Sequence, residues 1–70
     1  FNEKRELETL PGQISALESE QARLQARLSD PALYRDAPEE VGEATSRLDA
    51  VEVELEEAMS RWIELESRTG

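Results

Sequence analysis

Apolar side chains recur in the first part of the chain at steps of three or four residues, with one step of seven. The positions are Leu7, Leu10, Ile14, Leu17, Leu24 and Leu28, and Gln21 falls in the gap of seven. This is the a and d pattern of a heptad repeat, which is typical of a helix that packs along a narrow seam. A strand would alternate with period two, and no such alternation occurs.

The second part of the chain carries a more regular heptad pattern. Val41, Leu48, Leu55 and Trp62 recur every seven residues, and Ala44, Val51, Ala58 and Leu65 follow three residues after each. These four unbroken heptads predict a long helix over residues 39–68. The first pattern predicts a helix over residues 11–29.

Between the two patterns lies a segment, residues 30–38, that predicts a turn of the chain. Pro31 and Pro38 cannot both lie inside one continuous helix, because each removes an amide donor and crowds the preceding turn. Asp30 suits an N-cap with Pro31 at the first helical position, so a short helical turn is expected over 31–35.

Two further signals concern helix boundaries. Asp36 followed by Glu39 has the spacing of a capping box that opens the second long helix. Pro11 disfavours helical geometry at Leu10 and is a good first residue of a helix. Residues 1–10 are therefore expected to form a separate short leading helix or a kinked lead-in.

The two heptad patterns fit each other as an antiparallel pair in which every a position faces a d position. The facing pairs are Leu7–Leu65, Leu10–Trp62, Ile14–Ala58, Leu17–Leu55, Gln21–Val51, Leu24–Leu48 and Leu28–Ala44. Trp62 is expected to plug the open end of the hairpin, close to the small Gly12. The predicted fold is all-α, a monomeric antiparallel two-helix coiled-coil hairpin within one domain, and a fragment of a longer protein.

Composition narrows the possible functions. The 70 residues include no Cys and no His, 36% are charged, and only 4% are aromatic. Disulfides and thiolate metal sites are thereby excluded, and no apolar run approaches the roughly 20 residues of a membrane helix. A phosphate-binding loop motif is absent, and glutamate pairs such as Glu56-Glu57 fall on solvent-facing positions. We expect no catalysis and no cofactor in this chain.

The net charge of −9 is unevenly distributed. Residues 22–48 carry five acidic and four basic side chains, whereas residues 49–70 carry seven acidic and two basic ones. Acidity on this scale opposes non-specific binding to nucleic acid and to anionic lipid. The segment next to the turn is nevertheless close to neutral.

Four arginines account for that near-neutral segment. In the register above, Arg27 and Arg47 are expected to lie across from each other, with Arg23 one turn away and Arg35 in the turn. Together they would form a positive spot that contacts phosphates. Lys4 and Arg5 form a second, weaker basic spot.

An alternative interpretation assigns the arginines to ion pairs within one helix. Glu43–Arg47, Glu57–Arg61 and Glu64–Arg68 have the required spacing of four residues. Across the interface the register sets Glu20 opposite Glu54, so ion pairs are not expected to determine it.

Three segments together carry a family resemblance. They are Phe1–Glu8 followed by Leu10-Pro11, then Leu28-Ser29-Asp30-Pro31 with Tyr34, and finally Arg61-Trp62 with Leu65-Glu66. In this order they resemble the C-terminal domain of ABC-F ATPases of the Uup type. The resemblance implies a cytoplasmic parent with two ATP-binding cassettes that use ATP and Mg²⁺, no membrane domain, and an association with the ribosome and with DNA. It also implies a basic linker ahead of this domain.

Two other functions stay open at this point. Leu28-Ser29-Asp30-Pro31 followed by Ala37–Val41 is similar to the C-terminal coiled coil of valyl-tRNA synthetases, which contacts tRNA, although that arm is normally rich in lysine. A structural coiled coil for protein–protein contact or self-association would equally suit an acidic surface and a small seam. The partners to weigh are therefore DNA, ribosomal RNA, tRNA and protein.

Overall fold

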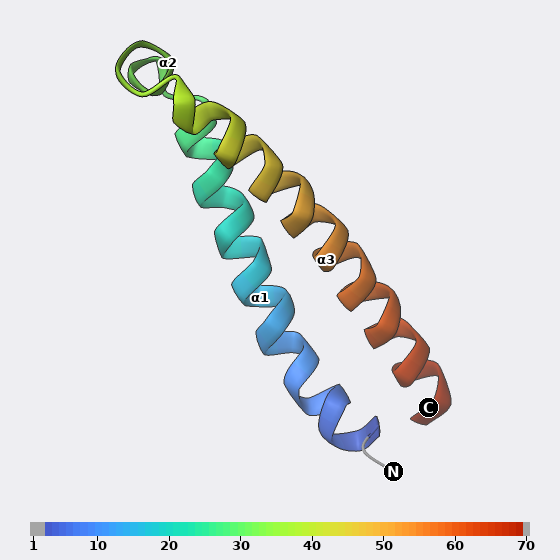
Figure 1. Ribbon diagram of the computed structural model, residues 1–70. Coiled ribbons are helices and arrows are strands. Elements are labelled where there is room, and N and C mark those ends of the chain that lie inside the picture. Colours follow the sequence, from blue (N-terminus) through green and yellow to red (C-terminus); the bar gives the residue numbers. More distant parts are fainter. Residues whose placement is uncertain (1–2, 70) are drawn as a thin grey trace.

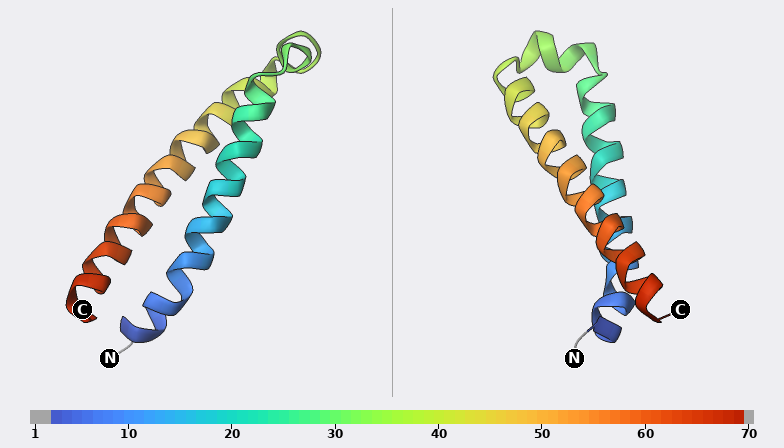
Figure 2. Two further views of the ribbon diagram at one scale, coloured as in Figure 1. Left: turned by 180° about the vertical axis from the view of Figure 1, so that it is seen from behind. Right: turned by 90° about the vertical axis from the view of Figure 1, so that its right-hand side faces the viewer.

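A computed structural model describes residues 3–69 of the chain, so Phe1 and Asn2 of the resemblance lie outside the described residues. Three helices follow one another: α1 (Glu3–Leu28), α2 (Pro31–Asp36) and α3 (Glu39–Thr69). α1 and α3 run antiparallel and lie side by side, and α2 crosses between them at the far end (Figures 1 and 2). The molecule measures 51 × 15 × 14 Å. The predicted helical hairpin is confirmed.

The seam between α1 and α3 is built from the predicted heptad positions. All fifteen of them are buried or half-buried, and Val51 and Leu65 have no exposed surface. Gln21 reaches across the seam, where its Nε2 donates to Glu52 Oε2 at 3.4 Å, next to its expected partner Val51. A two-helix seam leaves most of each helix in water, which explains why few side chains are fully buried.

The turn has the predicted chemistry. The Asp30 carboxylate accepts a hydrogen bond from the Ala32 amide at 3.0 Å, and Pro31 opens α2. Leu33 is buried beneath the turn, and its carbonyl accepts from the Ala37 amide at 2.9 Å. The Tyr34 hydroxyl donates to the Leu28 carbonyl at 2.6 Å, so the short helix is tied back to the end of α1.

The predicted capping box at Asp36 and Glu39 is wrong. Asp36 is the last residue of α2, and its carboxylate accepts from Arg35 Nε at 3.2 Å. α3 begins at Glu39 directly after Pro38, whose carbonyl accepts from the Val41 amide. Proline before the first turn costs no hydrogen bond, because the amides of that turn have no partner within the helix.

The predicted break at Pro11 is also wrong as a boundary between separate helices. α1 runs without interruption from Glu3 to Leu28, through Leu10 and Pro11, so the described part of the leading segment and the first hairpin helix are one helix. The first turns of α1 change direction relative to the rest of the helix, as a kinked lead-in would (Figure 2). Proline inside a helix removes one hydrogen bond and bends the axis without having to end the helix, and Leu10 directly before it is buried.

Trp62 lies at the open end, half-buried beside Pro11 and Ile14. Gly12 does not make room for it, because a Cβ added at Gly12 would meet nothing within 4 Å. The indole of Trp62 therefore does not occupy the space beside the Gly12 Cα. Pro11, one residue earlier, is the neighbour of the indole.

Candidate functional site

Arg27 and Arg47 line one hollow near the turn, together with Glu40 and Glu43, but carboxylates neutralise both arginines. Arg27 donates to the Glu40 carboxylate at the start of α3. Arg47 donates from Nε and Nη2 to the two oxygens of Glu20, at 2.6 and 2.8 Å. A weaker contact joins Arg47 Nη1 to Glu54 Oε2 at 3.4 Å. Each of these two arginines is thus bound to a carboxylate of the opposite helix.

The same kind of bridge recurs along the hairpin. At the open end Arg61 forms a bidentate pair with Glu6, at 2.8 and 3.0 Å, and Arg68 reaches Glu3 at 2.6 Å. Arg68 also bonds Glu64 at 2.8 Å, which is the one predicted spacing-of-four pair found among the described residues. Arg61 pairs with Glu6 and Glu64 and not with its predicted partner Glu57. Arg47 likewise pairs with Glu20 and not with its predicted partner Glu43.

These bridges join the two helices beside the seam. Glu20, which was expected opposite Glu54, and Glu54 itself both contact the guanidinium group of Arg47, so a cation lies between the two carboxylates. The expectation considered only which residues stand at the same height on the two helices. An arginine side chain is long enough to reach a carboxylate that does not stand at its own height on the partner helix.

These bridges change the acidity of the groups that form them. The hydrogen bond from Arg61 holds the pKa of Glu6 below its ordinary value of 4.5, and the bond from Arg47 does the same to the pKa of Glu20. The carboxylates in turn raise the pKa of both guanidinium groups. Partial desolvation acts in the opposite direction for all four groups and is outweighed by the hydrogen bonds.

The other basic candidates are differently placed. Within residues 3–69, Arg23, Lys4 and Arg5 are exposed and make no hydrogen bond or ion pair, although the charge of Arg23 helps to lower the pKa of Glu20. Arg35 contacts only its neighbour Asp36, and 73% of its side chain is exposed. Of the four tip arginines, Arg23 and Arg35 thus remain accessible to a ligand.

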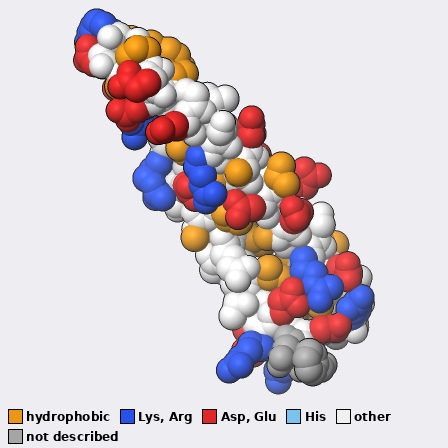
Figure 3. Space-filling view, viewed as in Figure 1, with side chains coloured by type: hydrophobic (Ala, Val, Ile, Leu, Met, Phe, Trp, Pro, Cys, Tyr) orange, Lys and Arg blue, Asp and Glu red, His pale blue; other side chains and the backbone are white. Residues whose placement is uncertain are grey.

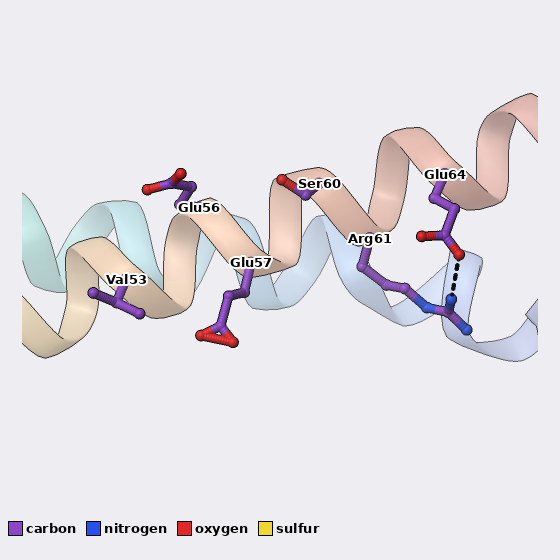
Figure 4. A pocket seen from close by; sticks show the side chains of 6 residues that line it. All are labelled: Val53, Glu56, Glu57, Ser60, Arg61 and Glu64. Carbon is purple, nitrogen blue, oxygen red and sulfur yellow. Dashed lines mark hydrogen bonds and ion pairs between the residues drawn. The ribbon is translucent and has the colours of Figure 1, made fainter.

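The face drawn in Figure 3 is mixed in charge. Blue and red side chains lie next to one another on it, and no continuous positive surface covers the tip on that face. The neighbouring glutamates of α3 do not point toward a common site either. Glu56 and Glu57 point away from each other, whereas Arg61 turns to Glu64 (Figure 4). Among residues 3–69 no three Asp or Glu side chains are grouped as a metal site would require, and none of the helices could span a membrane.

A feature that the sequence analysis missed is an apolar groove at the open end of the hairpin. This groove, called here the open-end groove, has a volume of about 350 Å³. Its lining consists of Pro11, Ile14, Ser15, Glu18, Met59, Trp62 and Ile63. Met59 and Ile63 lie outside the seam positions and are 44% and 62% exposed. In the sequence, these two apolar residues beside the heptad positions were the feature from which the groove could have been predicted.

The comparisons with known proteins agree with the family resemblance. Residues 1–67 match the family described as the ABC transporter C-terminal domain. Two proteins of Haemophilus influenzae, an ATP-binding protein Uup-like and an ATP-binding protein Uup, are each 40% identical to the chain over 68 residues. No solved structure is significantly similar to the chain.

The matches include nearly all of this chain but only a small part of each relative. The alignments cover 97% of this chain but only 15% and 10% of the two relatives. The antiparallel hairpin, the capped turn at Asp30-Pro31 and the half-buried Trp62 all lie inside the matched range. The chain therefore belongs to the ABC transporter C-terminal domain family and is homologous over nearly its whole length to Uup-like ATP-binding proteins.

Proposed function

We propose that this chain is the non-catalytic C-terminal arm of an ABC-F ATPase and that its tip contributes to binding nucleic acid, either DNA or ribosomal RNA. The names of the two relatives state that they bind ATP. The chain spans only a small part of each, so in this proposal ATP and Mg²⁺ are bound elsewhere in the parent protein. The parent would work in the cytoplasm.

The observation that carries the proposal is the accessibility of Arg23 and Arg35. Arg35 lies in α2, which forms the end of a 51 Å molecule that is furthest from both termini. An arm attached at its open end would present this guanidinium group to a distant ligand. Exposed guanidinium groups donate well to phosphate oxygens, and contacts of this kind position a protein on nucleic acid without reading its sequence.

The bridged arginines contribute less in this proposal. Arg27 and Arg47 would have to leave Glu40 and Glu20 before they could contact a phosphate. Lys4 and Arg5 are unpaired within the described residues, but they lie at the opposite end of the hairpin. Because the chain has a net charge of −9, its own affinity for nucleic acid should be weak and strongly dependent on salt.

The test is a titration of labelled duplex DNA, branched DNA, ribosomal RNA fragments and tRNA with the chain at low salt, followed by fluorescence anisotropy. We expect the double variant Arg23→Gln/Arg35→Gln to bind more weakly and to reduce the slope of log affinity against log salt by about 2 on duplex DNA. Lys4→Gln/Arg5→Gln is the matched control, since it removes two exposed, unpaired positive charges at the opposite end of the hairpin. Equal weakening by this control, or no binding at low salt, would contradict the proposal.

A second candidate function is protein–protein contact, and the open-end groove favours it. Apolar side chains that remain exposed on a small acidic domain are a common mark of a docking surface. Sedimentation velocity at several concentrations separates this function from self-association, because a hairpin with a closed seam stays monomeric. Preferential binding of tRNA in the titration would instead support an arm like that of valyl-tRNA synthetases.

A further inference from the structure

The open-end groove joins a second, shallower groove on the same side of α3. Met59 and Ile63 line both, and the second groove is completed by Gln21, Glu52, Leu55, Glu56 and Ser60. Together the two grooves form a continuous surface that follows the axis of the hairpin. An apolar ridge, Met59 and Ile63, runs along its centre, and Trp62 lies beside the ridge.

Carboxylates surround this surface. Glu18 borders the open-end groove, and Glu52 and Glu56 border the second one. Among the described residues that line the two grooves, none is Lys or Arg. The carboxylates that Arg47, Arg61 and Arg68 neutralise are a different set: Glu3, Glu6, Glu20, Glu54 and Glu64. The charge around the grooves is therefore not compensated by the bridges.

We propose that this surface is a docking site for a basic amphipathic helix, whose apolar side chains would cover Met59, Trp62 and Ile63 while its Lys or Arg residues meet Glu18, Glu52 and Glu56. A helix presents apolar side chains on one face every three or four residues, which suits an elongated apolar ridge. Flanking cations would supply complementary charge, which increases the rate of association and selects the partner.

The same charges argue against other occupants. A second copy of this chain would bring another −9 to the contact, and like charges at an interface oppose association. Nucleic acid is excluded from this surface for the same reason, since its phosphates would face carboxylates. The docking surface is lined by residues of α1 and α3 and includes neither Arg23 nor Arg35, so the two proposals depend on different side chains and stand or fall separately.

Trp62 offers a direct measurement, because it is the only Trp of the chain and lies in the groove. The probe is a Trp-free synthetic helix of Leu and Lys with the leucines on one face. Three other peptides serve as controls: a scrambled peptide of the same composition, a peptide with Glu in place of Lys, and a peptide with Gln in place of Leu. We expect the Leu–Lys helix alone to shift the Trp62 emission to shorter wavelength in a saturable titration, and to bind at least tenfold more weakly in high salt.

Variants of exposed residues test the position of the site without unfolding the chain. Met59→Gln and Ile63→Gln should each weaken binding at least fivefold, whereas Val53→Gln should leave it unchanged. Val53 is the matched control, since it is 56% exposed on the same helix and lines neither groove of this surface. Glu18→Gln and Glu56→Gln should each weaken binding two- to fivefold, and circular dichroism confirms that every variant remains helical.

Several results would overturn the proposal. Equal binding of the Leu–Glu peptide would remove the role of charge, and equal binding of the scrambled peptide would remove the role of a helical face. Equal effects of Val53→Gln and Ile63→Gln would place the contact elsewhere on α3. If the chain dimerised and Ile63→Gln made it monomeric, the occupant would be a second copy and not a basic helix.

Discussion

Two substitutions only two residues apart test most directly which face of α3 packs against α1. Leu65 has no exposed surface, whereas Ile63 on the same turn is 62% exposed. Leu65→Ala removes three carbon atoms from the seam, worth about 0.8 kcal/mol each as lost burial, or roughly 2.4 kcal/mol in all. A cavity adds to this cost, but a two-helix seam can relax, so we expect a loss of about 2–3 kcal/mol, at the low end of measured Leu→Ala values.

That loss is large for a domain of this size. At roughly 0.05–0.15 kcal/mol per residue, the free energy of unfolding of a 70-residue domain is about 4–10 kcal/mol. Leu65→Ala should therefore lower Tm by roughly 10–20 °C. Ile63→Ala removes a side chain that stays largely in water and introduces the best helix former, so its effect should lie within about 0.5 kcal/mol of zero.

The assay is urea and thermal unfolding of both variants, followed by far-UV circular dichroism. Because the two positions lie on one turn of one helix, the comparison cancels differences in position along the hairpin. If the two variants changed stability by the same amount, or if Ile63→Ala were the more damaging, α3 would not present Leu65 to α1. The assignment of the seam, and with it the position of the open-end groove, would then be refuted.

Two further predictions concern the bridges. Glu20→Arg places a second guanidinium group next to Arg47 and should lower Tm. The double variant Glu20→Arg/Arg47→Glu restores a pair of opposite charges and should regain most of the loss. A double variant no more stable than the single one would mean that the two side chains do not interact. The pKa of Glu6 lies below its ordinary value of 4.5 in the folded chain, so the stability from its bridge to Arg61 is complete above pH 4.5 and is lost as the pH falls through the folded value. The difference in Tm between the unmodified chain and Glu6→Gln should therefore be constant near neutral pH and vanish on acidification, whereas a constant difference at all pH values would contradict a role of the ionised carboxylate.

Local signals in the sequence predicted the hairpin because each of them acts over a few residues. Heptad spacing identifies the buried stripe of a helix whatever its partner is, and all fifteen expected positions are at least half-buried. Asp30-Pro31 predicted the start of the short helix, since an N-cap involves only the amides that follow it. At Pro11 the sequence predicted a break although α1 is continuous there, because the loss of one hydrogen bond bends a helix without having to end it.

What the sequence by itself determined is thus the pair of helices, the turn between them and the faces that meet. The partners of the arginines and the open-end groove were decided only by the tertiary structure. Both depend on how far side chains reach across two helices at a particular separation and rotation, as in the pairing of Arg47 with Glu20 instead of with its neighbour Glu43. Heptad spacing says which residues lie between the helices, but not which long side chains meet beside the seam or which apolar ones remain uncovered there.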